Sequence, residues 1–185
     1  MSGGPLEGVR VVDLTSVVVG PLATQILADH GAEIIKVESM AGDLVRQLNG
    51  KSVTPGMGAK FLHLNRNKRS VALDLKHADG MEALRRLIAK ADVMVWNVRP
   101  AAMARLGLSY DDVKKINPKI IYCGLYGFGQ DGRYKDKPAY DTIIQGASGM
   151  AALHHRSTGE PRYVPMVVAD KVVGMTAVQM IVMAL

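Results

Sequence analysis

Residues 9–37 read VRVVDLTSVVVGPLATQILADHGAEIIKV, and this stretch decides the fold. Residues 9–14 and 32–37 are short, apolar and rich in β-branched side chains, which is typical of buried strands. Residues 21–30 between them are predicted to form a helix, because proline suits a first helical turn and Gly31 can close the last one. Strand, helix and strand in this order form a βαβ unit, which implies parallel strands and a right-handed crossover.

The same alternation continues along the chain. Further strands are predicted at 70–75, 91–98 and 120–125, and helices at 77–90, 99–106, 109–116, 140–152 and 172–185. Polar segments 38–59, 127–138 and 154–162 are predicted to be loops or turns. The sequence therefore predicts an α/β fold with a Rossmann-like, doubly wound and mostly parallel sheet.

Ligands of such sheets bind outside the carboxyl ends of the strands. The loops that begin at Thr15, Glu38, Asn97 and Tyr126, together with Asp170, are therefore expected to face one cleft.

Composition narrows the class of protein. The chain has 185 residues, of which 48% are hydrophobic and 22% charged, enough for one compact domain. A single cysteine, Cys123, excludes an intramolecular disulfide and fits the reducing cytoplasm. The net charge of +6 is spread along a chain with few aromatic residues, so a small phosphate-bearing ligand is a better expectation than nucleic acid.

No membrane partner is expected. The first ten residues lack a signal-peptide pattern, and the apolar segment 172–185 is too short to span a bilayer. That segment also ends without a helix-closing residue, so we expect the sequence to be part of a longer protein.

Several familiar motifs are incomplete. Residues 127–132 match G-x-G-x-x-G, but they follow a late strand and not the first one, as a dinucleotide fingerprint requires. The segment around Ser148 lacks the nucleophile elbow of a hydrolase. His154 and His155 are adjacent and Cys123 has no partner at zinc spacing, so no metal site is predicted.

A cluster of basic residues occupies 65–69, read NRNKR. It is either a solvated surface loop or a phosphate site, since lysine and arginine supply charged donors. Arg99 and Arg105, which flank a short predicted helix, could belong to the same site. The residues alone leave these alternatives open.

Asp170 is the residue that needs an explanation. It lies between a short apolar run and the long apolar segment 172–185. An acid in such a setting is costly unless it is paired or functional. At a strand-to-helix turn it could simply be an N-cap, which is the favoured interpretation from this stretch alone.

Taken together, many segments resemble the family III CoA-transferases, the CaiB–BaiF type. They are 5–14 (PLEGVRVVDL), 19–21 (VGP), 27–38 (LADHGAEIIKVE), 65–70 (NRNKRS), 91–95 (ADVMV), 105–108 (RLGL), 117–118 (NP), 127–130 (GFGQ) and 169–170 (AD). The resemblance covers the whole chain in order. Family members are substantially longer, which implies that residues 1–185 are the N-terminal CoA-binding α/β portion of the large domain, without the small domain and the C-terminal part.

The resemblance implies roles for individual residues. Asp170 matches the catalytic aspartate. The positions that match CoA-binding segments are Val17, Val18, Leu73 to Lys76, Asn97, Arg99, Arg105 and Tyr140. CoA and its thioesters are then substrates, no tightly bound cofactor is expected, and the full-length protein is expected to be an interlocked cytoplasmic homodimer acting on acyl-CoA and carboxylic acids.

The family also contains racemases of 2-methylacyl-CoA thioesters, which move the α-proton with a histidine. Here Tyr140 occupies that position, and tyrosine, with an ordinary pKa of about 10, is a poor proton shuttle at neutral pH. The expected reaction is therefore CoA transfer through an aspartyl intermediate. An unperturbed aspartate is ionised at pH 7 and needs no general base.

Two departures from the family pattern are Trp96, in place of an acid before Asn97, and Ser39-Met40, in place of a proline-rich turn. Groups that stabilise the oxyanion are expected beyond residue 185. The alternatives that remain are a racemase, a CoA-binding chain without catalysis and, more distantly, a nucleotide-dependent oxidoreductase.

Overall fold

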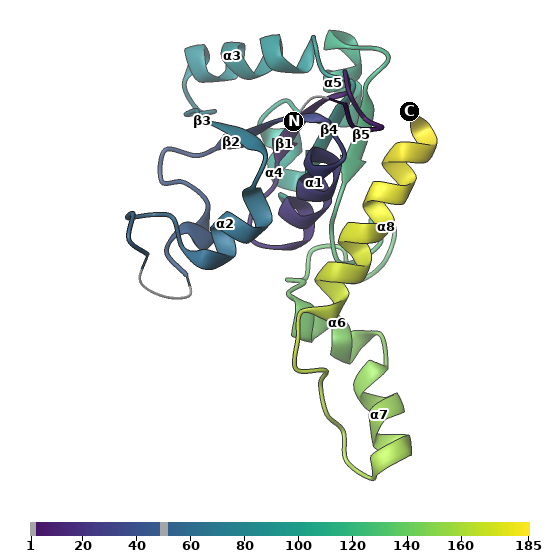
Figure 1. Cartoon of the computed structure of the whole chain (residues 1–185). Helices are drawn as coiled ribbons and strands as arrows, with labels where there is room; N and C mark the ends of the chain where they lie inside the picture. The colour runs from purple at the N-terminus through teal and green to yellow at the C-terminus, as the bar shows by residue number, and fades with distance from the viewer. Residues whose placement is uncertain (1–2, 49–51) are drawn as a thin grey trace.

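A computed structural model describes residues 3–48 and 52–185 and contains a five-stranded, wholly parallel sheet (Figure 1). The strands are β1 (Arg10–Leu14), β2 (Glu33–Glu38), β3 (Lys68–Ala72), β4 (Val93–Trp96) and β5 (Ile121–Gly124). Their order across the sheet is β3-β2-β1-β4-β5. This order confirms the predicted doubly wound α/β fold, because the chain runs outward from β1 first to one edge and then to the other.

The register brings two loops together at the centre of the sheet. Leu14, the last residue of β1, lies opposite Trp96, the last residue of β4. The chain therefore leaves β1 and β4 side by side, at the point where the strand order reverses. This topological switch point is where doubly wound sheets bind their ligands.

Helices cover both faces of the sheet. They are α1 (Val19–Asp29), α2 (Ala59–Asn65), α3 (Ala78–Ile88), α4 (Pro100–Arg105), α5 (Tyr110–Ile116), α6 (Asp141–Ala147), α7 (Met150–Thr158) and α8 (Val168–Ala184), with a 3-10 turn η1 (Leu44–Arg46). One core cluster joins the sheet to Leu84, Met103 and Val113 of α3, α4 and α5. The other joins it to Leu27 of α1 and Ile181 of α8.

Helix α8 packs closely along α1. A Cβ atom added to Gly174 would lie 2.8 Å from the carbonyl oxygen of Val19, so the two backbones approach to a distance that only glycine allows. Figure 1 shows α8 as a long yellow helix running beside α1. Its outward side exposes Met175, Met180 and Met183.

The predictions for residues 38–75 were partly wrong. The expected loop 38–59 contains η1, and α2 follows it where no helix was predicted; residues 49–51 of this loop lie outside the described residues. Strand β3 begins at Lys68 and not at Ser70, so the last two residues of the basic cluster belong to the sheet. A seven-residue helix such as α2 depends on packing, here of Phe61 and Leu64, more than on periodicity.

The C-terminal part also differs from the expectation. The single helix predicted at 140–152 is two helices, α6 and α7, separated by Gly149 with φ 82°. Helix α7 continues to Thr158, through most of the predicted turn, and buries none of its residues. It projects away from the sheet in Figure 1. The short apolar run before Asp170 is not a strand. None of the helices in the described ranges is long and apolar enough to cross a membrane.

Candidate active site

The loop after β1 starts from a buried, charged anchor. Asp13 accepts hydrogen bonds from the amide (2.9 Å) and hydroxyl (2.5 Å) of Thr15. Its second oxygen accepts from the Thr24 hydroxyl (2.6 Å) and pairs with Lys68 Nζ (3.1 Å). Burial raises the pKa of Asp13, but Lys68, Lys36 and the two hydroxyls outweigh it, so the pKa is lowered and the carboxylate stays ionised.

Asn97 fixes the next residue of this loop. Its Nδ2 donates to the Ser16 carbonyl (2.8 Å), and its Oδ1 accepts from the Ser16 amide (2.9 Å). The side chain thus extends the pairing of β1 and β4 beyond the last strand residue. The loops after β1 and β4 are therefore joined at the switch point, as the topology predicted. We expect Asn97 to fix the shape of the loop after β1.

Val17 and Val18 have different surroundings. Val17 is half-buried, has a φ of 71° and donates its amide hydrogen to Asp43 Oδ1 (3.2 Å). Val18 is 4% exposed, and its carbonyl accepts from the Leu22 amide (2.9 Å) at the start of α1. Of the two, Val17 has the more accessible side chain.

Leu73 and Lys76 lie past the carboxyl end of β3, at the edge of the sheet. The Leu73 amide donates to the Glu38 carbonyl (2.9 Å), and its side chain is half-buried. Lys76 is exposed in the turn before α3, where its amide donates to Asp74 Oδ1 (3.0 Å). This segment therefore lies at the same carboxyl end of the strands as the loops after β1, β2 and β4.

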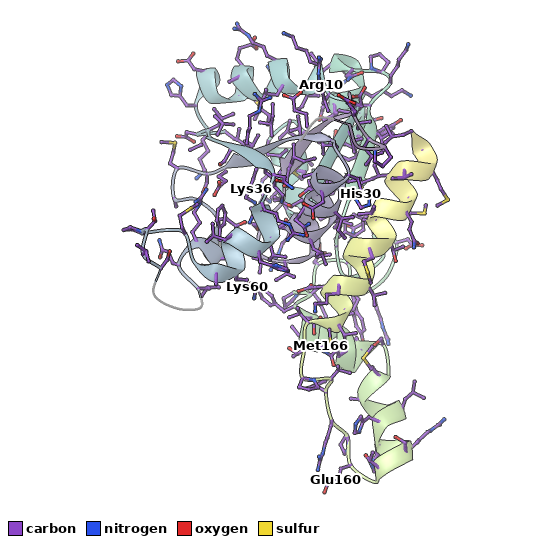
Figure 2. The ribbon with its side chains drawn as sticks, viewed as in Figure 1. Arg10, His30, Lys36, Lys60, Glu160 and Met166 are labelled. Carbon is purple, nitrogen blue, oxygen red and sulfur yellow. The ribbon has the colours of Figure 1, made fainter. Side chains whose placement is uncertain are left out.

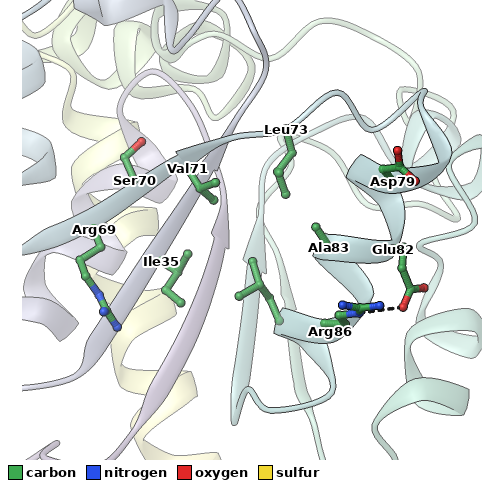
Figure 3. A pocket seen from close by; sticks show the side chains of 10 residues that line it. Ile35, Arg69, Ser70, Val71, Leu73, Asp79, Glu82, Ala83 and Arg86 are labelled. Carbon is green, nitrogen blue, oxygen red and sulfur yellow. Dashed lines mark hydrogen bonds and ion pairs between the residues drawn. The ribbon is translucent and has the colours of Figure 1, made fainter.

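A groove of about 610 Å³ runs from Leu73 between β3 and α3 (Figure 3). Apolar side chains from both elements form its floor, and Arg86, which bonds Glu82 (3.0 Å), stands at its rim. Its lining includes no residue of α1, α6 or α8. The groove is therefore separate from Asp170.

Arg99 and Arg105 flank α4, which follows β4. Both are exposed, and no carboxylate in the described part of the chain pairs with either. Arg99 immediately precedes the helix, and Arg105 ends it roughly 9 Å further along its axis. Both guanidinium groups can therefore meet an anion, but they lie at opposite ends of the helix.

Asp170 lies in the first turn of α8 and is half-buried. The N-cap prediction for it was wrong, because Val167 occupies the cap position and Asp170 is already inside the helix. Burial and the neighbouring Asp141 raise its pKa to about 6, while Lys60 opposes them. Figure 2 marks Lys60 on α2. A carboxylate of higher pKa is a stronger base than the unperturbed aspartate that the sequence led us to expect.

Asp141 supplies the cap that Asp170 was expected to provide. Its Oδ1 accepts the Asp170 amide hydrogen (3.1 Å), and its Oδ2 accepts from Gln145 Nε2 (2.6 Å). Gln145 in turn donates to the Met166 carbonyl (3.1 Å) and accepts from the Val164 amide (2.8 Å). This buried pair on α6 therefore fixes the segment that leads into α8 and the backbone of Asp170.

Tyr140 directly precedes Asp141 and α6. Tyr140 is 68% exposed, so its side chain is not packed into the protein, and the next residue, Asp141, accepts the Asp170 amide hydrogen.

The cluster at 65–69 is mainly structural. Arg66 pairs with Asp29 (2.5 Å), Lys68 with Asp13, and Arg69 with Glu33. Lys68 is buried, and its Nζ also donates to the Pro21 carbonyl (3.0 Å) and Asn65 Oδ1 (2.9 Å). The alternative of a phosphate site is therefore not supported for Lys68.

Sequence reasoning missed the buried polar residues beneath these loops. They are Asp13, Lys36, Asp43 and Asp141. A charged residue between apolar neighbours in a strand, such as Lys36 between Ile35 and Val37, was the available signal. In the described ranges no group of histidine, cysteine or carboxylate side chains could hold a metal ion.

Comparisons with known proteins agree with this arrangement. A family model described as CoA-transferase family III matches residues 6–185. The chain is 39% identical to a succinate–glutarate CoA-transferase of Agrobacterium fabrum, over 98% of this chain and 47% of that protein. It is 40% identical to a formyl-CoA:oxalate CoA-transferase of Streptomyces avermitilis, over 97% of this chain and 44% of that protein.

Solved structures give the same result. The crystal structure of a CAIB/BAIF family protein from Brucella suis matches with a TM-score of 0.93 and 37% identity, over 99% of this chain and 49% of that one. The chain thus spans about half the length of the relatives it matches. With a family model over nearly its whole length and the fold of a family member, the chain belongs to the CoA-transferase family III.

Proposed function

We propose that this chain supplies the CoA-binding part of an enzyme that moves CoA from an acyl-CoA thioester to a free carboxylic acid. Asp170 is the proposed nucleophile. The observation that carries this assignment is the setting of its carboxyl group, which is half-buried at the start of α8 beside a second acid and has a pKa raised to about 6. Among the described residues no cation forms an ion pair with Asp170, and a carboxyl group perturbed in this way is a candidate for a functional residue.

The proposed reaction begins when the Asp170 carboxylate attacks the carbonyl carbon of the donor thioester. The C–S bond breaks, CoA leaves as the thiolate, and a mixed anhydride joins Asp170 to the acyl group. The thiolate then attacks the aspartyl carbonyl, which forms an aspartyl-CoA thioester and releases the donor carboxylate. An acceptor carboxylate repeats both steps in reverse, so that acyl-CoA of the acceptor leaves and Asp170 is regenerated.

The pKa of Asp170 suits this role. At pH 7 a carboxyl group of pKa about 6 is about nine-tenths ionised, so no general base is required. Each tetrahedral oxyanion needs hydrogen-bond donors, each worth roughly 10²–10³ in rate. We propose that segments of the full-length protein beyond residue 185 supply them.

The proposed CoA site runs along the carboxyl ends of the strands. Val17, beside the switch point, would contact the nucleotide, with Val18 acting through the backbone. Leu73 and Lys76 would contact the adenosine end, and the exposed cations Arg99 and Arg105 would meet phosphate groups. Tyr140, exposed near Asp170, would contact the pantetheine or substrate.

Residues 1–185 would then be the N-terminal portion of the large domain in a cytoplasmic homodimer. The named relatives act on succinate, glutarate, formyl-CoA and oxalate, so small dicarboxylic acids are the first acceptors to test. Racemisation is the second candidate within the same family, and a tyrosine, Tyr140, where the racemases have a histidine argues against it.

The test uses the full-length protein, an acyl-CoA donor and hydroxylamine, which traps an aspartyl thioester as a hydroxamate. We expect trapping at Asp170 in the wild type, none in Asp170→Ala, and trapping at the wild-type level in Asp136→Ala, which removes an exposed acid. CoA transfer at an undiminished rate in Asp170→Ala would exclude the assignment. Deuterium incorporation at the α-carbon of a 2-methylacyl-CoA would instead support the racemase.

A further inference from the structure

The backbone at Val17 is in an unusual conformation. Among the described residues, Val17 and Asn67 are the non-glycine residues with positive φ, at 71° and 62°. Asparagine tolerates this left-handed region, whereas a β-branched residue there is strained. Val17 therefore needs surroundings that hold it in place.

A buried ion pair provides them. Asp43 Oδ1 accepts the Val17 amide hydrogen (3.2 Å) and also that of Val45 (3.1 Å). Asp43 Oδ2 faces Lys36 Nζ at 2.9 Å, and both side chains are 1% exposed. Lys36 Nζ also donates to the Thr15 carbonyl (2.7 Å). The contacts form a closed ring from Thr15 through Lys36 and Asp43 back to Val17.

The ring is anchored in the sheet. Lys36 belongs to β2 and lies inside the body of the fold (Figure 2). The Asp43 amide donates to Glu38 Oε2 (2.8 Å) at the end of the same strand. Glu38 is held by two hydrogen bonds from Arg46, at 2.7 and 2.6 Å. Asp43 therefore has little freedom to move away from Val17.

We propose that Asp43 is a positioning residue that keeps Val17 in its left-handed conformation, so that residues 15–18 meet the nucleotide part of CoA preformed. This rests on the proposed function. A preformed loop avoids the ordering cost of binding, whereas a loop free to relax would pay that cost each time CoA binds. Among the described residues no hydrogen bond or ion pair joins Asp43 to Asp170, so its effect should be on binding and not on turnover.

The test compares Asp43→Ala, Val17→Gly and the double variant in the full-length protein, with Asp136→Ala as the matched control. Asp43→Ala should raise the Kd for CoA, measured by calorimetry, about 10-fold or more and raise KM similarly, with kcat changed less than about 2-fold. Glycine adopts φ near 71° without support, so the double variant should recover CoA binding to within about 3-fold of Val17→Gly alone.

A readout that needs no CoA separates this inference from the proposed function. Hydrogen exchange at the Val17 amide should be slow in the wild type and fast in Asp43→Ala. If Asp43→Ala does not fold, Asp43→Asn, which keeps an acceptor for this amide, should leave the exchange slow and CoA binding within about 3-fold. Any one of three results would overturn the positioning role. The first is unchanged hydrogen exchange at the Val17 amide in Asp43→Ala, and the second is a double variant that binds CoA no better than Asp43→Ala. The third is Asp43→Asn that keeps slow exchange but loses CoA binding. Wild-type protein that fails to bind CoA would overturn the proposed function and the nucleotide role of the loop.

Discussion

Replacing Asp141 by asparagine in the full-length protein should lower the pKa of Asp170. Asp141 is the second cause of the raised pKa, after burial, because a negative charge nearby disfavours ionisation of Asp170. Asparagine keeps an oxygen that can accept the Asp170 amide hydrogen, which Asp141 Oδ1 accepts at 3.1 Å. The substitution therefore removes the charge and can leave the cap on α8 in place.

The expected change in the pKa of Asp170 is limited because burial raises this pKa more than Asp141 does. The pKa of Asp170 rises from 3.8 to about 6, and burial contributes more than Asp141. Removing the charge of Asp141 should therefore lower the pKa by about 0.5–1 unit. At pH 5 the ionised fraction of Asp170 would increase from about one-tenth to between a quarter and a half, which is a gain of about three- to fivefold.

The assay is the pH dependence of aspartyl-thioester formation in a single turnover, between pH 4.5 and 8. The wild-type rate should fall below a pH of about 6, and the acid limb of Asp141→Asn should lie about 0.5–1 unit lower. Rates in the two proteins should converge at pH 8, where Asp170 is ionised in both.

Loss of packing needs its own control. In the wild type Gln145 Nε2 donates a hydrogen bond to Asp141 Oδ2 at 2.6 Å. In Asp141→Asn the new amide nitrogen would face this donor, and two donors without an acceptor should cost about 1–3 kcal/mol of stability. Gln145→Ala disturbs the same contact without changing the charge, so its acid limb should stay at the wild-type pH. An acid limb in Asp141→Asn that does not move, or that moves to higher pH, would refute the coupling between the two acids.

Three further substitutions test the packing and electrostatics. Asp170→Asn should stabilise the protein at pH 7 by about 1 kcal/mol, a value reduced from the full pKa shift because the carboxyl group is partly exposed. Because the pKa of Asp170 is raised in the folded state, the wild type loses stability as the pH rises from about 4 to 6. In calorimetry the gain in stability of Asp170→Asn should therefore disappear below pH 4. Lys68→Met should cost about 3–5 kcal/mol in urea unfolding, because it leaves the buried carboxylate of Asp13 without its cation. Gly174→Ala should cost about 1–2 kcal/mol by the same measurement, since its Cβ would lie 2.8 Å from the Val19 carbonyl and force α8 away from α1.

The central strands could be predicted because most of their residues are buried, whereas the edge strand β3 is largely exposed and its start was misplaced. Residues 93–96 are all buried, and such a strand is a continuous apolar run in the sequence, bounded by polar turns. The convergence of the loops at Thr15 and Asn97 followed from topology alone, without knowledge of any contact. In the structure, two hydrogen bonds between the Asn97 side chain and the Ser16 backbone join these loops.

Contacts between distant residues could not be predicted in the same way. Asp141 caps α8 across 29 positions, and nothing in the spacing of the chain connects the two. The sequence did show a lone acid before a long apolar segment, but it could not show that another carboxylate would occupy the capping role. The raised pKa of Asp170 likewise results from its burial and from the negative charge of Asp141, and neither can be read from the spacing.

Three buried charged side chains lie beneath the loop that follows β1, and their shared role is to hold this loop. Asp13, Lys36 and Lys68 lie in adjacent strands β1, β2 and β3, and all three are almost fully buried as side chains. Apolar residues of similar volume would often stabilise such sites as well or better, so stability alone does not explain these charges. Each of them holds the backbone of the loop after β1 or a carboxylate that does so. Their common effect is to fix the shape of residues 15–18, and a CoA site built on that loop would therefore depend on residues that never touch CoA.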